Sequence, residues 1–278
     1  MGTSRSAAET TAETYYDSED ADTFYEAVWG GEDIHIGLYE TPGISIADAS
    51  HKTVERMIHQ LQDFDASSKV IDLGAGYGGS ARALTTALGC EVVCLNVSER
   101  QNDRNRMLNQ QQALDRKITV VHGSFEDIPQ PDNSIDLVWS QDAFLHSGRR
   151  RLVLDEVARI LKPGGQLIFT DPMQADDCPD GVLQPVYDRL ELDSLASIGW
   201  YREQLSDLEF SEITVLPMVE QLRTHYDRVR TSLAARQNEM VGKISEDYFA
   251  RMLTGLQNWV TAADNGYLAW GILHFRKG

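Results

Sequence analysis

The sequence predicts an α/β fold in which a mostly parallel sheet of seven strands is covered by helices on both faces. Three observations predict it. Between Lys69 and Asp171, short and almost wholly apolar segments alternate with helical segments, a pattern typical of a parallel sheet buried on both sides. A glycine-rich loop follows the first apolar segment, and a Lys-Pro-Gly-Gly turn precedes the fifth.

The first part of the chain differs from this regular core. Residues 1–14 are polar and acidic, and we expect them to form a disordered tail. Residues 15–45 are richer in aromatic side chains, and we expect them to form an N-terminal arm that breaks at Gly30 and Gly31. Apolar side chains then recur at helical spacing over residues 46–61.

Hydrophobic periodicity places the elements that follow. Strands are predicted at residues 69–73, 91–95, 118–122, 135–140, 166–171, 212–216 and 267–275. Helices are predicted at residues 78–88, 98–114, 149–161, 180–195, 201–208 and 219–263. The insertions 172–198 and 217–264 are expected to cap the sheet together with the arm. Residues 15–278 are thus expected to form a single domain.

Composition excludes several classes of protein. The apolar runs are too short to span a bilayer, and the N-terminus lacks the apolar centre of a secretory signal. The three cysteines have no metal-ligand spacing, so we expect no metal site, and we expect reduced thiols in the cytoplasm.

The net charge limits the classes of partner that the protein is expected to bind. The chain has 25 Lys plus Arg against 43 Asp plus Glu, a formal net charge of −18. Such a surface repels phosphate backbones and anionic lipids, so we expect neither a nucleic acid nor a membrane partner, and a monomer or small homo-oligomer. Ordinary solubility and adaptation to a salty cytoplasm both explain this acidity.

The glycine-rich loop is the most informative segment. It reads VIDLGAGYGG from Val70 to Gly79 and joins a buried strand to a helix. Glycine lets the backbone turn tightly and approach a ligand without a Cβ in the way. The loop matches both the G-x-G-x-x-G of dinucleotide folds and the Asp-x-Gly-x-Gly-x-Gly of methyltransferases.

Three features favour a methyltransferase. Asp72, just before the glycines, suits a cationic methionine moiety and would repel a pyrophosphate. Asn96 ends the next strand, where an acidic residue commonly holds ribose hydroxyls. The segment Arg159–Asp171 resembles the turn before the fifth strand of class I methyltransferases. The resemblance implies a Rossmann-like fold that binds S-adenosyl-L-methionine and releases S-adenosyl-L-homocysteine.

A narrower resemblance covers most of the chain beyond its first dozen residues. It is carried by the segments Phe24–Glu40, Leu73–Arg82, Trp139–Ser147 and Trp270–Lys277. These resemble the sarcosine/dimethylglycine N-methyltransferases, which complete the synthesis of the osmolyte glycine betaine. The resemblance implies methylation of sarcosine to dimethylglycine and of dimethylglycine to betaine. The motif Ser-x-Asp-Ala-x-Leu-His also resembles, more distantly, the phosphoethanolamine methyltransferases.

The resemblance and the loop together imply a set of cofactor contacts. They are expected from Tyr25, Ile34, His35, Asp72, Gly74, Ala75, Gly76, Asn96, Val97, Gln101, Ser124, Phe125 and Gln141. Of these, Ser124 and Phe125 are expected to frame the adenine. The family favours an acidic residue near Ser124, so the adenine contact is expected from the backbone or from Glu126.

Methyl transfer from a sulfonium is an in-line displacement that needs an aimed amine lone pair, and no metal or covalent intermediate. Positioning supplies much of the rate, and a nearby base can take the amine proton. By analogy with the phosphoethanolamine enzymes, Tyr16 and His146 are candidates for a catalytic latch that closes the arm and orients the amine. Asp142 is a further candidate in the substrate site.

The substrate also carries a carboxylate, which a bidentate arginine suits. Arg202 is the first candidate. His225 and Tyr226 are alternatives that either bind the carboxylate or form part of an aromatic wall. Trp29 and Met173 are expected to complete an aromatic wall, because aromatic faces attract quaternary ammonium groups.

Two other functions remain open from the sequence. One is a methyltransferase acting on phosphoethanolamine or a lipid. The other is a non-catalytic regulatory protein that binds a nucleotide. The intact loop and the long cap favour an enzyme.

Overall fold

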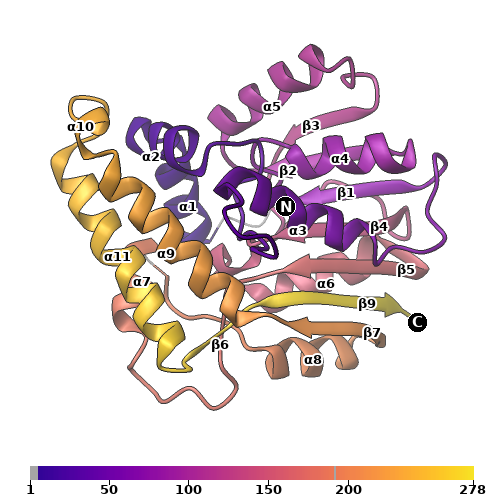
Figure 1. The fold of residues 1–278 in the computed structure, drawn as a ribbon. Helices are drawn as coiled ribbons and strands as arrows, with labels where there is room; N and C mark the ends of the chain where they lie inside the picture. Colours follow the sequence, from indigo (N-terminus) through magenta and orange to yellow (C-terminus); the bar gives the residue numbers. More distant parts are fainter. Residues whose placement is uncertain (1–5, 191) are drawn as a thin grey trace.

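A computed structural model describes residues 6–190 and 192–278. Its main sheet has seven strands in the order β3-β2-β1-β4-β5-β9-β7, and β9 is antiparallel to both neighbours (Figure 1). The strands are β1 Lys69–Leu73, β2 Glu91–Asn96, β3 Ile118–His122, β4 Ile135–Gln141, β5 Leu161–Thr170, β7 Phe210–Pro217 and β9 Gly271–Lys277. The sheet confirms the predicted fold class. A second, two-stranded sheet pairs β6 Met173–Gln174 with β8 Leu268–Ala269.

The helices fall into those that cover the sheet and those at its carboxyl edge. The covering helices are α3 Ile46–Ile58, α4 Gly79–Leu88, α5 Glu99–Gln111, α6 Arg150–Ile160 and α8 Ile198–Asp207. The others are α1 Ala7–Asp17, α2 Glu19–Phe24, η1 Tyr25–Trp29, η2 Phe144–His146, α7 Gln184–Leu190, α9 Val219–Ala235, α10 Gln237–Met240 and α11 Glu246–Asp264.

Apolar side chains bury both faces of the sheet. On one face, Val54 and Met57 of α3 and Leu84 of α4 pack with Trp139 of β4. On the other face, α6 and α8 cover the strands and bury Tyr201, among other side chains. The strands are therefore apolar on both sides, which is why the sequence showed apolar runs in place of alternation.

Serine side chains begin several of these helices. Ser45, Ser98, Ser197 and Ser245 each accept a hydrogen bond from a backbone amide in the first turn of α3, α5, α8 and α11. An N-cap of this kind stabilises a helix by about 1 kcal/mol, because the first amides have no partner within the helix. The starts of α3, α5 and α8 lie within three residues of the predicted ones, whereas the sequence predicted no helix start at α11.

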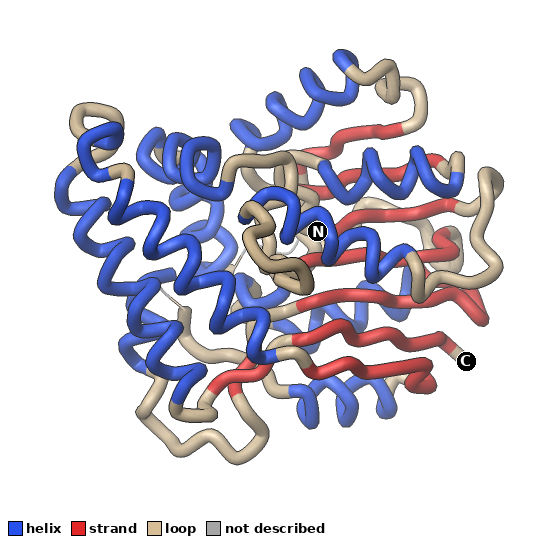
Figure 2. The backbone as a smooth tube through the Cα atoms, viewed as in Figure 1, coloured by secondary structure: helices blue, strands red, loops and turns tan. Residues whose placement is uncertain are grey.

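The remaining helices gather over the carboxyl ends of the parallel strands (Figure 2). There α9 and α11 lie alongside each other, and α7 packs against α11. Their apolar side chains form a cluster with those of α2 and η1, including Phe24, Tyr25, Trp259 and Trp270. This group of elements is called the cap below. Among the described residues, no helix is both long enough and apolar enough to cross a bilayer.

The structure corrects three predictions. Residues 7–14, expected to be disordered, belong to α1, because Ser6 caps this helix and Ala12 is buried. The tail residues 1–5 lie outside the described residues. The predicted helix 219–263 is divided into α9, α10 and α11 around the turn at Val241–Ile244, and the predicted helix 180–195 is limited to α7.

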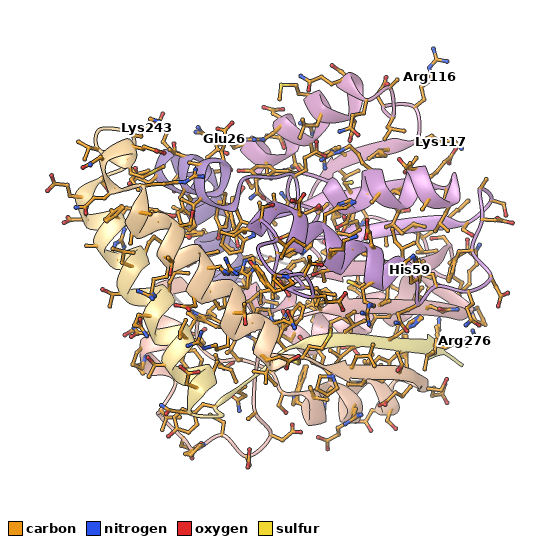
Figure 3. The ribbon with its side chains drawn as sticks, in the orientation of Figure 1. Glu26, His59, Arg116, Lys117, Lys243 and Arg276 are labelled. Atoms are coloured by element: carbon orange, nitrogen blue, oxygen red, sulfur yellow. The ribbon has the colours of Figure 1, made fainter. Side chains whose placement is uncertain are left out.

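Charged side chains project from the outer surface of the fold, as Glu26, Arg116, Lys117 and Lys243 do in Figure 3. The candidate site described next lies instead in the interior, where β1, β2 and β4 end.

Candidate functional site

Two adjoining cavities lie where β1, β2 and β4 end. The larger, of about 60 Å³, is lined by Glu9, Ala12, Tyr16, Ile34, Gly74, Gly76, Asn96, Val97, Gln101, Phe125, Gln141, Asp142, Ala143 and His146. The smaller, of about 30 Å³, is lined by Glu32, Asp33, Ile34, His35, Asp72, Gly74, Ala75, Gly76, Gly79, Ser80 and Gln141. The linings bring together all the cofactor residues that the sequence proposed except Tyr25 and Ser124.

The glycine loop forms the floor shared by both cavities. Gly74 and Gly76 have φ angles of +76° and +52°, in the left-handed region that side chains disfavour. A Cβ on Gly74 would lie 2.4 Å from the Cβ of Ala143. The backbone amide of Gly74 donates to Leu95 O at 2.8 Å, which ties the loop to β2. Only glycine at position 74 lets the chain turn this close to β4.

Asp72 presents a carboxylate without a hydrogen-bond partner to the smaller cavity. The residue is 2% exposed, and its Oδ2 accepts no hydrogen bond from the described residues. Burial raises the pKa of Asp72 to about 7. The Nε2 of Gln141 likewise has no partner in the described part of the chain, while its Oε1 accepts from Ser80 and Trp139. The cavities therefore offer a buried acceptor and a buried donor to a ligand.

Asp33 of the arm lies between His35 of the arm and His51 of α3, and it closely approaches the start of α4. Burial opposes ionisation of Asp33, but the nearby His35 imidazole and a hydrogen bond with His51 lower the pKa of Asp33. Burial also opposes protonation of His35, yet Asp33, 3.7 Å from its Nε2, raises the pKa of His35. A Cβ on Gly79 would lie 2.1 Å from Asp33 Oδ1, so this close approach requires glycine at the start of α4.

Tyr16 and His146 meet at the larger cavity. The Tyr16 hydroxyl lies 3.1 Å from His146 Nε2, and the two rings pack edge to face with centroids 5.4 Å apart. Tyr16 comes from α1 and His146 from η2, which follows β4. The hydrogen bond therefore closes α1 over the carboxyl edge of the sheet.

Four further rings that the sequence proposed stand behind Tyr16 and line neither cavity: those of Tyr25, Trp29, His225 and Tyr226. Ring centroids are 5.7 Å apart for Tyr16–Tyr25, 5.2 Å for Tyr25–Trp29 and 4.6 Å for Trp29–His225. Tyr226 continues the series, 6.0 Å from His225. These rings form a contiguous aromatic support for Tyr16.

His225 has a structural place that the sequence did not predict. It is fully buried, and its Nδ1 accepts hydrogen bonds from Gly37 N at 3.0 Å and Tyr39 Oη at 2.9 Å. Because Nδ1 is an acceptor, it carries no proton. The structure thus corrects the expectation that His225 and Tyr226 face the substrate: His225 joins the arm to α9, and Tyr226 packs on Trp259.

Asp142 lines the larger cavity, but its carboxylate is engaged with protein donors. Oδ2 accepts from Ile36 N at 2.7 Å, and Oδ1 accepts from Trp270 Nε1 and Thr170 Oγ1, both at 2.8 Å. Its φ of +50° is unusual for a residue other than glycine. Asp142 therefore joins the arm, β5 and the residue before β9, and its role in substrate binding stays a prediction.

Met173 and Arg202 are not brought to the cavities. Met173 is fully buried in β6 and packs in the core between the sheet and α6 and α8. Arg202 lies on α8 with an exposed side chain, and its guanidinium binds both carboxylate oxygens of Glu212 at 2.8 and 3.1 Å. Arg202 thus binds a carboxylate through two hydrogen bonds, as the sequence predicted. The carboxylate, however, belongs to an exposed residue of β7 and not to the substrate.

Arg202→Ala is accordingly expected to leave the Michaelis constants for both amine substrates within about twofold of wild type. The lost contact is a solvent-exposed ion pair, which contributes roughly 0–1 kcal/mol to stability. Steady-state kinetics and thermal unfolding of the variant check this. A rise of tenfold or more in the Michaelis constant would return Arg202 to the substrate site.

Sequence reasoning missed Glu9 and Ala12, which line the larger cavity from α1. Ser124, outside both linings, donates a hydrogen bond to Glu9 Oε1. The sequence did contain a signal for this helix. Ser6 and Glu9 form the Ser-x-x-Glu pattern of a helix start, and Ser6 Oγ accepts from Glu9 N at 3.2 Å.

Comparison with known proteins agrees with this geometry. A methyltransferase domain family matches residues 71–169. A sarcosine/dimethylglycine N-methyltransferase from Halorhodospira halochloris is 53% identical over 268 residues, 96% of each chain. The chain belongs to the sarcosine/dimethylglycine N-methyltransferase family.

Two further relatives cover nearly the full length of this family member. A dimethylglycine N-methyltransferase from Parasynechococcus marenigrum is 48% identical over the whole of this chain and 99% of its own. A solved structure from Galdieria sulphuraria, assigned as a sarcosine dimethylglycine methyltransferase, has a TM-score of 0.90. It is 41% identical and covers 95% of this chain and 99% of its own.

The cofactor of this family is S-adenosylmethionine, and the two cavities fit its chemistry. The unpartnered Asp72 carboxylate suits a cation, and the glycine floor leaves room for a ligand that lies on the backbone. The cavities, about 60 and 30 Å³, are smaller than the roughly 300 Å³ of ordinary small-molecule pockets. The cofactor is therefore larger than either cavity by itself, and α1 and the arm cover both.

Proposed function

We propose that this protein methylates the nitrogen of sarcosine and of dimethylglycine, with S-adenosylmethionine as methyl donor and glycine betaine as final product. The observation that carries the proposal is the Tyr16–His146 hydrogen bond beside a glycine floor and the Asp72 carboxylate. Relatives with these substrates in their names match the chain over nearly its full length.

The bound cofactor supplies an electrophilic methyl group on a sulfonium. The amine lone pair forms the new C–N bond as the C–S bond breaks, and the electron pair of that bond goes to sulfur. An ammonium has no lone pair, so the acceptor must lose a proton before or during the transfer. Asp72 and the glycine floor hold the donor side, and Tyr16 and His146 face the acceptor side of the larger cavity.

The Tyr16–His146 pair can take up that proton. The phenol oxygen accepts the amine proton while its own proton passes to His146 Nε2 along the 3.1 Å hydrogen bond. General base catalysis of this kind contributes roughly 10²–10⁴ in rate. The same hydrogen bond places α1 over the cavity and excludes water from it.

The aromatic support also suits the product. A quaternary nitrogen is attracted to an aromatic face by about 0.5–2 kcal/mol. Tyr16 lines the cavity, and Tyr25 and Trp29 hold its ring in place. We propose that the protein works in the cytoplasm, where its free thiols at Cys90, Cys94 and Cys178 remain reduced.

Product analysis tests the proposal. Glycine, sarcosine, dimethylglycine and phosphoethanolamine are offered separately with labelled cofactor, and the products are identified by mass spectrometry. Sarcosine should yield dimethylglycine and betaine, dimethylglycine should yield betaine, glycine should react little and phosphoethanolamine should not react. Turnover of phosphoethanolamine with an efficiency comparable to dimethylglycine contradicts the proposal.

A further inference from the structure

We propose that Glu9 of α1 recognises the exocyclic amino group of the cofactor's adenine. The N-terminal helix then supplies the carboxylate, in place of the loop between β3 and β4. The inference rests on S-adenosylmethionine as the cofactor and is independent of which amine is methylated. It is drawn from the surroundings of two carboxylates, those of Glu9 and Glu126.

Glu126, the acidic residue nearest to Ser124 in sequence, is engaged elsewhere. Its Oε1 accepts from Ser147 Oγ at 2.6 Å and from Ser6 Oγ at 3.0 Å, and its Oε2 accepts from Arg149 Nε at 2.8 Å. The residue is 2% exposed and does not line either cavity. Both of its oxygens are therefore occupied by protein donors.

Glu9, unlike Glu126, lines the larger cavity of the site. It is 2% exposed and lines the larger cavity together with Phe125, Asn96 and Val97. Its Oε1 accepts a hydrogen bond from Ser124 Oγ, and Ser124 Oγ in turn accepts from Glu126 N at 2.8 Å. The Glu9 carboxylate is thus fixed beside the loop that the sequence assigned to the adenine.

The chemistry of adenine matches this wall of the cavity. Its exocyclic amine is a hydrogen-bond donor on the edge of a flat, largely apolar ring. A buried carboxylate costs free energy unless donors reach it, and a charge-assisted hydrogen bond is the strong kind. The Phe125 side chain supplies an apolar surface in the same lining. A carboxylate beside an apolar wall therefore binds a base that carries a hydrogen-bond donor at this edge more tightly than one that carries an acceptor there.

Because Glu9 belongs to α1, its contact with adenine also affects how α1 docks over the cavity. Tyr16 follows Glu9 by seven residues, about two helical turns, so both side chains lie on the same face of α1. Both line the larger cavity. Adenine binding to Glu9 therefore favours the docked position of α1 in which Tyr16 reaches His146.

Calorimetry with two ligands tests the inference. S-adenosylhomocysteine carries the 6-amino group, and S-inosylhomocysteine carries a 6-oxo group, an acceptor, in its place. The wild type should prefer the adenosyl ligand by roughly tenfold or more, because a site built to bind a donor rejects an analogue without it. Glu9→Gln should lose about tenfold in adenosyl affinity and gain inosyl affinity, since an amide can donate to the 6-oxo group. Glu9→Ala should lose the preference without the gain.

Glu13→Gln is the matched control. Glu13 lies one turn further along α1, its Oε1 is 3.5 Å from His122 Nε2, and it lines neither cavity. This variant should keep the wild-type ratio of affinities. Circular dichroism and thermal unfolding establish that each variant is folded.

The outcomes separate three possibilities. A changed ratio in Glu9→Gln and an unchanged ratio in Glu13→Gln support the inference. Equal weakening of both ligands in Glu9→Gln shows that Glu9 only anchors α1, and overturns it. If the wild type binds neither ligand, the cofactor assignment itself fails, whereas product analysis decides the substrate separately.

Discussion

Replacing Tyr16 by phenylalanine is expected to lower kcat for dimethylglycine by roughly 100-fold, with cofactor affinity within about threefold of wild type. The ring and its contacts with Tyr25 and His146 remain, so the change removes the hydroxyl alone. The magnitude is that of a lost general base. Single-turnover rates together with calorimetry of S-adenosylhomocysteine binding measure the two effects separately.

Tyr15→Phe provides the control for this experiment. Tyr15 is the neighbour of Tyr16, but its hydroxyl lies 3.2 Å from that of Tyr248 in the cap. It should retain kcat within about threefold. His146→Asn should resemble Tyr16→Phe, and the double variant should be little worse than either, because residues that act as a unit have non-additive effects. Wild-type turnover by Tyr16→Phe would remove the pair from catalysis.

Asp72→Asn is expected to weaken cofactor binding by 30-fold or more, since losing one partner of a buried charged pair costs about 2–5 kcal/mol. The groups that act on Asp72 are His35 and Arg82, which favour its ionised form, and Asp33, which opposes it; burial outweighs them and raises its pKa to about 7. The cationic cofactor binds the ionised form of this carboxylate. Affinity should therefore rise as pH increases through 7.

The expected pH dependence distinguishes wild type from variant. Between pH 5.5 and 8.5, the binding constant of the wild type should increase roughly thirtyfold, because protonation of Asp72 competes with the cofactor. In Asp72→Asn this increase should disappear. Asp171→Asn is the control, because burial also raises the pKa of Asp171 to about 7 but Asp171 lines neither cavity.

The stability of the ligand-free protein should fall as pH rises, whereas its affinity for the cofactor should increase. The folded pKa of Asp72 is raised above its unfolded value of about 3.8. The contribution of Asp72 to the free energy of unfolding is therefore fully present below pH 4, and it is lost as pH rises through 7. Asp72→Asn should raise Tm at pH 8 by at least about 3 °C, and by less at pH 5. Equal Tm values at both pH values, with unchanged cofactor affinity, would contradict the assignment of Asp72.

The sequence by itself determined the fold class, the order of the core elements and the cofactor floor. These depend on local patterns. Apolar runs form buried parallel strands, serine caps begin helices, and Gly74 is required by a backbone with positive φ next to Ala143. Asp72, Asn96 and Gln141 lie in or at the ends of strands, and parallel strands bring those ends to one edge. Their proximity in space was therefore predictable.

Only the tertiary structure decided which polar side chains face the cavities and which hold the fold together. Asp142 and His225 have the residue types of a substrate site, but donors from distant segments engage Asp142 Oδ1 and Oδ2 and His225 Nδ1. Arg202 pairs with Glu212 of β7. Glu9 lies in a polar segment with little apolar periodicity, and becomes buried only because α1 docks on the loop after β3. The partners of Asp142 Oδ2, His225 and Glu9 lie more than a hundred residues away in the sequence, so they follow from how segments dock, and no local pattern encodes them.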